Sequence, residues 1–251
     1  MALATTRIFS DALGMAVTVD VILPQQKDLE PGRKAAVLWL LHGAFGTHSD
    51  WLRLTGIERY VRPYNLAVVM PSAQNSGYAD MAHGGNYYTY IAKELPQKMR
   101  MLFNLSDKRE ENFIAGLSMG GEGSMRIGLA NPEQYSVIGC LSAGVNNAQG
   151  TSADTRRHDL VVGDRDVSGT YLDGFASAQR ILDEGLPRPR IYHACGTEDF
   201  LLPSARATRD FFRDKPFEYT YAEDPGAHTW DFWDDHIKQF IAFLGLPPRQ
   251  Q

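Results

Sequence analysis

Strand-length segments recur along the chain and alternate with segments of helical periodicity. The predicted strands lie at residues 35–41, 66–70, 112–115, 136–142, 190–195 and 217–221. The predicted helices lie at residues 51–64, 87–103, 120–130, 176–183, 205–213 and 230–244. A continuous apolar run such as residues 35–41 is typical of a strand buried on both faces, as in a parallel sheet. The alternation therefore predicts a mostly parallel central sheet with helices on both faces.

The N-terminal part of the chain has a different pattern. Residues 15–23 alternate so that successive side chains point to opposite faces, and residues 7–10 precede them across a turn at 11–14. This pattern predicts an antiparallel pair of strands. We expect the pair to lie at the N-terminal edge of the sheet.

Residues 146–173 are the least regular part of the chain and are rich in Gly, Asp, Ser and Thr. Long irregular segments in compact domains tend to be functional, so we expect a small lid or insertion here. We find no internal repeat, low-complexity tract or linker in the sequence. The length of 251 residues suits one α/β domain over residues 1–251.

A G-x-S-x-G pentapeptide stands at residues 116–120, between a predicted strand and a predicted helix. In that context the motif forms a nucleophile elbow, a sharp turn that lifts the serine hydroxyl clear of the sheet. Gly116 and Gly120 have no Cβ, so strand and helix can approach closely while Ser118 takes a strained conformation. Ser118 is therefore the candidate nucleophile.

A serine hydroxyl needs a base to take its proton, and the base needs an orienting partner. On a sheet of this kind the expected chain order is Ser, then Asp or Glu, then His. Asp199 follows the strand at 190–195, and His228 follows the last strand. We predict that Asp199 orients His228 and that His228 is the general base for Ser118.

Other acidic and histidine residues compete for these roles. Asp199 could instead cap the helix that follows it. Three histidines compete with His228. His42 is expected to brace the glycine turn through hydrogen bonds, His193 to lie inside a strand, and His236 to face solvent on the last helix. The rival carboxylates are Glu198, Asp164 and Asp166.

The negative oxygen of a tetrahedral intermediate needs hydrogen-bond donors. One donor is expected to be the backbone N–H of Met119, the residue after the nucleophile. The other is expected from the glycine-containing turn at residues 43–46, with Ala44 as first choice and Phe45 as the alternative.

Composition excludes several functions. Hydrophobic residues make up 43% of the chain, which is ordinary for a globular protein. The formal net charge of −5 argues against nucleic acid as a partner. No stretch approaches the roughly 20 apolar residues of a membrane span, and the first 20 residues lack the pattern of an export signal. We therefore expect a cytoplasmic protein, although a mature secreted form with its signal removed would look the same. We also expect a small-molecule substrate. A homo-oligomer is the base-rate expectation.

The sequence contains two cysteines, Cys140 and Cys195, both in apolar, strand-like surroundings. Neither has the C-x-x-C spacing of a metal or redox motif, so buried free thiols are expected. The sequence gives no sign of a metal site or a cofactor site.

These motifs together resemble the tributyrin esterase branch of the esterase D family of α/β-hydrolases. That family also includes S-formylglutathione hydrolases and feruloyl and acetylxylan esterases. The resemblance spans roughly residues 17–244 and rests on Trp51 and on residues 41–46 (LHGAFG), 94–96 (ELP), 113–121 (FIAGLSMGG), 195–199 (CGTED) and 226–230 (GAHTW). One departure is Glu122, where many relatives carry an aromatic or small residue after the second elbow glycine. It bears on the shape of the acyl pocket.

The resemblance implies a cofactor-free serine carboxylesterase for short acyl groups, acetyl to butyryl, that works through an acyl-enzyme. It assigns Ser118, His228 and Asp199 to the triad, and Ala44 and Met119 to the oxyanion hole. The enzymatic alternatives are an S-formylglutathione hydrolase or a carbohydrate acetyl or feruloyl esterase. The non-enzymatic alternative is an inactive member of the fold that serves as a binding module.

Overall fold

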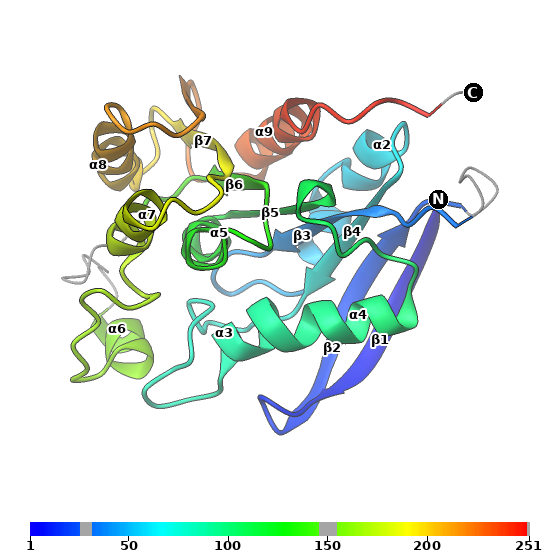
Figure 1. Ribbon diagram of the computed structural model, residues 1–251, viewed down its shortest axis with the longest axis horizontal. Helices are drawn as coiled ribbons and strands as arrows, with labels where there is room; N and C mark the ends of the chain where they lie inside the picture. The colour runs from blue at the N-terminus through cyan, green and yellow to red at the C-terminus, as the bar shows by residue number, and fades with distance from the viewer. Residues whose placement is uncertain (26–31, 146–154, 250–251) are drawn as a thin grey trace.

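The computed structural model describes residues 1–25, 32–145 and 155–249 (Figure 1). Within these residues the centre is an eight-stranded sheet with the order β1-β2-β4-β3-β5-β6-β7-β8. The strands are β1 Ala2–Ser10, β2 Met15–Leu23, β3 Ala36–Leu41, β4 Leu66–Pro71, β5 Asn112–Leu117, β6 Val137–Leu141, β7 Arg190–Gly196 and β8 Tyr219–Asp224. β1 pairs antiparallel with β2, and β2 pairs antiparallel with β4. The pairs from β4 to β8 are parallel, which confirms the predicted sheet and its antiparallel N-terminal edge.

Helices cover both faces of this sheet (Figure 1). Successive side chains of a strand point to opposite faces, so one strand can contribute to a buried cluster on each side. On β3, Trp39 belongs to one buried apolar cluster, whereas Leu38 and Leu40 belong to the other. The first cluster also takes side chains from α3 Tyr87–Thr89, η2 Tyr90–Glu94, α4 Leu95–Leu102, α5 Met119–Ala130, α7 Gly174–Asp183 and α8 Leu202–Phe212. The second takes side chains from α1 Asp50–Leu54, α2 Ile57–Val61 and α9 Trp230–Phe243.

Two predicted helices differ in detail from the structure. The helix expected at 51–64 is divided into α1 and α2 by an extended Thr55, and the Gly56 N–H donates to Asp234 at 2.7 Å. The helix expected at 87–103 contains a π-helical turn, where the Leu95 N–H reaches back to the carbonyl of Tyr90. Pro96 follows this turn directly and has no N–H to donate, so a wider turn before it accommodates the proline.

The candidate lid at 146–173 is described only from Thr155 onward, and its residues 146–154 lie outside the described part. α6 Thr155–Val161 begins there and ends on the loop after β4. The backbone N–H of Ala82 donates to Val161, and Val161 packs with Ala79, Val167 and Leu172. The prediction of a lid role stays a prediction.

Another short helix, η3 Arg109–Glu111, precedes β5.

His236 does not face solvent as predicted. Its side chain on α9 is buried at 2% exposure and lies 2.9 Å from the hydroxyl of Tyr192 on β7. The reason is helical spacing, since Phe232 and Phe240 lie four residues before and after it and are both buried against the sheet. The helical spacing of residues 232–240 places His236 on the inner face of the helix.

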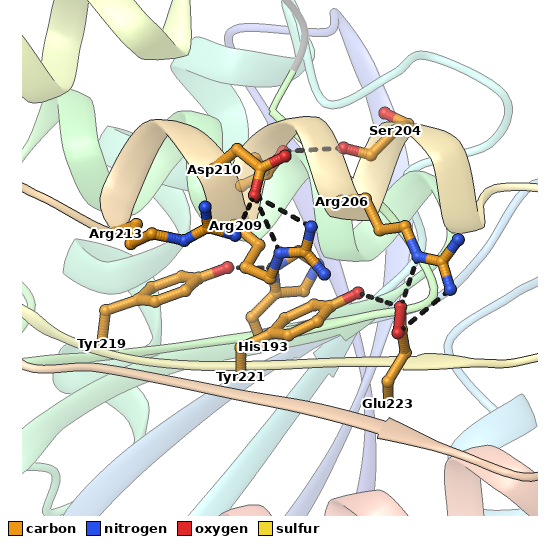
Figure 2. Close-up of polar contacts among 10 residues, drawn as sticks. His193, Ser204, Arg206, Arg209, Asp210, Arg213, Tyr219, Tyr221 and Glu223 are labelled. Carbon is orange, nitrogen blue, oxygen red and sulfur yellow. Dashed lines mark hydrogen bonds and ion pairs between the residues drawn. The ribbon is translucent and has the colours of Figure 1, made fainter.

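A polar cluster covers the sheet at its β8 edge (Figure 2). Tyr219, Tyr221 and Glu223 alternate along β8 and point to the same face, toward α8. Arg206 on α8 donates to Glu223 at 2.7 Å, and the hydroxyl of Tyr221 donates to the same carboxylate. Arg209 lies over the Tyr221 ring at 5.5 Å. Paired charges and aromatic rings therefore cover one face at this edge of the sheet.

His193 lies beneath this cluster on β7 and is fully buried (Figure 2). Its Nε2 lies 2.7 Å from the carbonyl of Ala143, so Nε2 carries the hydrogen, and Nδ1 accepts from the Tyr219 hydroxyl at 2.6 Å. Both ring nitrogens are thus satisfied in the neutral form. Burial lowers the pKa of His193 from 6.5 to about 4, against a smaller opposing effect of the Ala143 hydrogen bond.

This pKa predicts a stability change with pH. Between pH 6.5 and about pH 4 the unfolded chain binds a proton at His193 that the folded chain does not, so stability is complete above this range and falls as the pH is lowered through it. We expect His193 to contribute a loss of about 1.4 kcal/mol per pH unit. Urea unfolding from pH 7 to pH 5 should show a shallower dependence in His193→Gln than in the wild type. An equal slope in both proteins would contradict this assignment, and His83→Gln, at an exposed position, is the matched control.

Candidate active site

Ser118 occupies a tight turn between β5 and α5. Its backbone has φ 52° and ψ −122°, a strained conformation for a residue other than glycine. A Cβ at position 116 would lie 2.4 Å from the carbonyl oxygen of Gly120, and one at position 120 would lie 2.5 Å from that of Leu41. Only glycine fits at both positions. The turn leaves Ser118 partly exposed beside buried neighbours.

The structure brings Ser118, His228 and Asp199 into one hydrogen-bonded chain. His228 Nε2 lies 2.9 Å from Ser118 Oγ, while Nδ1 lies 3.0 and 2.9 Å from the two oxygens of Asp199. An ionised carboxylate only accepts, so Nδ1 carries the hydrogen and Nε2 is free to accept from the serine hydroxyl. The geometry gives a neutral imidazole the tautomer that a general base requires.

Asp199 is buried at 4% exposure and keeps a low pKa. Burial alone would raise the pKa of this carboxyl. Hydrogen bonds from His228, the Leu201 N–H and the Ser142 hydroxyl outweigh that effect and hold the pKa below its ordinary value. Asp199 is therefore ionised at neutral pH and faces the ring it orients.

The ring of His228 is held by two aromatic side chains as well. Its centroid lies 4.6 Å from that of Phe200, at an interplanar angle of 49°, and 4.9 Å from that of Trp233, at 90°. These contacts restrict rotation of the ring about its Cβ–Cγ bond. Together with the Asp199 hydrogen bonds, they aim Nε2 at Ser118.

Ser142 is a site residue that the sequence analysis missed. It follows β6 in a left-handed conformation, φ 50°, and its N–H is bound to the Ala194 carbonyl at 2.8 Å. Its hydroxyl accepts from Trp233 Nε1 at 2.9 Å and donates to Asp199. Ser142 thereby connects the carboxylate to the tryptophan that packs on His228. The available signal was its position at the end of the strand between those carrying Ser118 and Asp199.

The turn after β3 borders Ser118 closely, since a Cβ at Gly43 would lie 3.5 Å from that of Ser118. The two candidate donors in this turn differ. Phe45, at φ 65°, donates its N–H to Asn75 Oδ1 at 2.6 Å, so that hydrogen is already engaged. This favours Ala44 over Phe45 as an oxyanion donor. Met119 is the first residue of α5, where helical geometry leaves the backbone N–H without an intrahelical acceptor.

His42 braces the turn, as predicted. Its Nδ1 donates to the Gly43 carbonyl at 2.7 Å, and its Nε2 accepts from the Ala73 N–H at 2.9 Å. Burial lowers the pKa of His42, so the ring stays neutral. The Tyr78 hydroxyl donates to the His42 carbonyl at 2.8 Å and fixes the same segment.

The rival candidates lie in other environments. The Glu198 carboxylate accepts from the N–H of Gly226, and Asp164 and Asp166 are exposed. Glu122 on α5 is paired with Arg126. Both cysteines are buried free thiols, as expected.

The described residues hold no group of three or more His, Cys, Asp or Glu side chains placed to bind a metal ion. Of the helices described, none has the length and apolar character needed to cross a membrane.

Comparisons with known proteins found similar esterases and serine hydrolases. The family model described as "Putative esterase" matches residues 10–244. An acetyl esterase of Caldicellulosiruptor saccharolyticus is 33% identical over 262 residues, covering 97% of this chain and 98% of that protein. The solved structure of fluorophosphonate-binding serine hydrolase F of Staphylococcus aureus matches with a TM-score of 0.88 and 32% identity, over 97% of this chain and 98% of that one. An S-formylglutathione hydrolase of the same organism matches with a TM-score of 0.86 and 31% identity, over 97% and 99%. These matches confirm the α/β-hydrolase fold.

The position of Ser142 predicts a loss of reactivity at Ser118 when its hydroxyl is removed. We expect Ser142→Ala to react with a fluorophosphonate probe about tenfold more slowly, because Asp199 loses a hydrogen bond to a charged group. The rate of covalent labelling measures this directly.

Ser10→Ala is the matched control. Ser10 is also buried and also donates to a carboxylate, Glu94 at 2.7 Å, but it lies on β1. Equal labelling rates in wild type and Ser142→Ala, or an equal loss in both variants, would show that Ser142 does not position the triad.

Proposed function

The chain belongs to the Esterase family, and we propose that it is a serine carboxylesterase that removes short acyl groups, acetyl to butyryl, from small esters. Its relatives establish the broader activity, that of a carboxylic ester hydrolase, and identify the family that the sequence motifs indicated. The observation that carries the proposed serine mechanism is the hydrogen-bonded chain from Ser118 through His228 to Asp199 at a strained elbow.

In the proposed first half-reaction, His228 Nε2 takes the proton of Ser118 while Oγ attacks the carbonyl carbon of the ester. The carbonyl oxygen becomes negative and accepts hydrogen bonds from the backbone N–H groups of Met119 and Ala44. The intermediate then collapses, the bond to the alcohol oxygen breaks, and that oxygen takes the proton from His228. The product is an acyl ester on Ser118 and a free alcohol.

In the second half-reaction, water takes the place of the alcohol. His228 removes a proton from water, the resulting oxygen attacks the acyl carbon, and Ser118 leaves with the proton that His228 returns. Asp199 stays ionised throughout and stabilises the imidazolium that forms twice in each cycle. No cofactor takes part in this scheme.

The short acyl range is supported by the acetyl esterase relative, which aligns over 97% of this chain. A second candidate, S-formylglutathione hydrolysis, is supported by the S. aureus structure that carries that name. Both activities transfer a very small acyl group through the same chemistry and differ in the leaving group. A carbohydrate acetyl or feruloyl ester is a weaker alternative, since a ferulic acid esterase structure at 23% identity shares the fold alone.

The cytoplasmic location, the small-molecule substrate and the homo-oligomeric state remain predictions from the sequence. They are not needed for the proposed chemistry.

Chain-length selectivity and dependence on Ser118 test the proposal. With p-nitrophenyl esters of two, four, eight and twelve carbons, we expect kcat/KM to be highest at two or four. Ser118→Ala should lower it by at least about 10⁴-fold, because the nucleophile is removed. A maximum at eight or twelve carbons would contradict the acyl range, and full activity in Ser118→Ala would contradict the triad.

The leaving group separates the two candidate activities. We expect kcat/KM for simple acetyl esters to be comparable with or above that for S-formylglutathione. A strong preference for the glutathione thioester would establish the second candidate in place of the first.

A further inference from the structure

Phe200 is an exposed aromatic residue in direct contact with the ring of His228. It follows Asp199 immediately, yet the two side chains differ sharply, with Asp199 4% exposed and Phe200 71% exposed. Two hydrogen bonds to Asp199 fix the turn that carries them. The N–H of Leu201 donates to Asp199 Oδ1 at 2.8 Å, and the N–H of Leu202 donates to the Asp199 carbonyl at 3.0 Å.

This turn sends the carboxylate inward and the phenyl ring outward, over the imidazole at 4.6 Å. The ring therefore stabilises the hydrophobic core little, because most of its surface stays in contact with water. A large exposed aromatic side chain beside a catalytic group is available to a bound molecule.

The chemistry of the proposed function determines which part of the substrate lies there. The leaving oxygen must take its proton from His228 Nε2, so it has to come within hydrogen-bond distance of that atom. The carbonyl oxygen is held elsewhere, by the N–H groups of Ala44 and Met119. Ala44 follows β3 and Phe200 follows β7, with the β5 strand of Ser118 between them. The alcohol portion of the ester therefore departs on the His228 side, next to Phe200.

The charges on this side are acidic. The loop segments at residues 196–200 and 223–228 contain Glu198, Asp199, Glu223 and Asp224 and neither lysine nor arginine. The nearby Arg206 is bound to Glu223 through two of its nitrogens, at 2.7 and 3.2 Å, so these two charges offset each other and the remaining charges of the segments are those of Glu198, Asp199 and Asp224. An anionic leaving group would thus meet repulsion here, whereas an uncharged apolar group would meet the face of a phenyl ring.

We propose that Phe200 forms the leaving-group subsite and that the enzyme prefers esters of uncharged alcohols that carry an aromatic ring. The proposal rests on the proposed esterase function and adds its substrate class. Phe200 is then a specificity-determining residue for the alcohol portion of the ester.

Benzyl acetate and methyl acetate test this preference, because their alcohols have similar basicity and differ mainly in the ring. Stacking on one aromatic side chain together with burial of the ring predicts kcat/KM about tenfold higher for benzyl acetate. In Phe200→Ala we expect this benzyl-to-methyl ratio to fall close to one, and in Phe200→Tyr, which keeps the ring, to remain near the wild-type value. Met101→Ala is the control, because it removes an exposed apolar side chain on α4, and we expect it to leave the benzyl-to-methyl ratio unchanged.

A charged analogue tests the electrostatic part. The acetyl ester of 4-(hydroxymethyl)benzoate keeps the ring and adds a carboxylate, and we expect its kcat/KM to be several-fold below that of benzyl acetate at low ionic strength, with the difference shrinking as salt is added. Equal rates would overturn the preference for uncharged alcohols.

Two results would overturn the assignment of Phe200. One is a wild-type ratio near one, and the other is an equal loss on both esters in Phe200→Ala, which would mean that Phe200 only supports His228. Either result, together with Ser118-dependent hydrolysis of p-nitrophenyl acetate, leaves the proposed function intact. Absence of Ser118-dependent hydrolysis of any ester would instead refute the proposed function.

Discussion

The close approach of β5, α5 and the end of β3 is the constraint on which the rest of the site depends. With a Cβ at Gly116 only 2.4 Å from the Gly120 carbonyl, neither position accepts another residue without moving the helix away from the sheet. That movement would shift Met119, whose N–H starts α5, and would release Ser118 from its left-handed backbone conformation. The reactive hydroxyl and one proposed oxyanion donor are therefore placed by the same steric contact.

The remaining site residues depend on the parallel order of the strands, because the carboxyl ends of parallel strands meet at one edge of the sheet. Ser142, Asp199 and His228 follow β6, β7 and β8, which lie in that order beside β5. Neighbouring strands connect them directly, as in the bond from the Ser142 N–H to the Ala194 carbonyl of β7. Buried His193 adds a second connection through the Ala143 carbonyl. The contacts that stabilise the sheet at its β8 edge therefore also help to hold the site residues in place.

The sequence was sufficient to predict the sheet, its antiparallel edge and the three residues that the structure joins by hydrogen bonds. Continuous apolar runs mark buried strands, and the chemistry at their ends follows from chain order. It was insufficient where the outcome depends on tertiary contacts. The solvent position assigned to His236 was wrong, and the break between α1 and α2 depends on Asp234, far along the chain. Ser142 and Phe200 carry no motif, and their roles follow from contacts with Asp199 and His228 that only the fold creates.

The central claim is that Ser118 carries the acyl group during turnover. The most direct test is to mix the enzyme with p-nitrophenyl acetate, quench in acid within the first turnovers, and locate the acetyl group by peptide mass spectrometry. The account predicts one acetyl group per chain on the peptide that contains Ser118, and none in Ser118→Ala. Undiminished hydrolysis in Ser118→Ala, or an acetyl group on another residue that persists in Ser118→Ala, would contradict it.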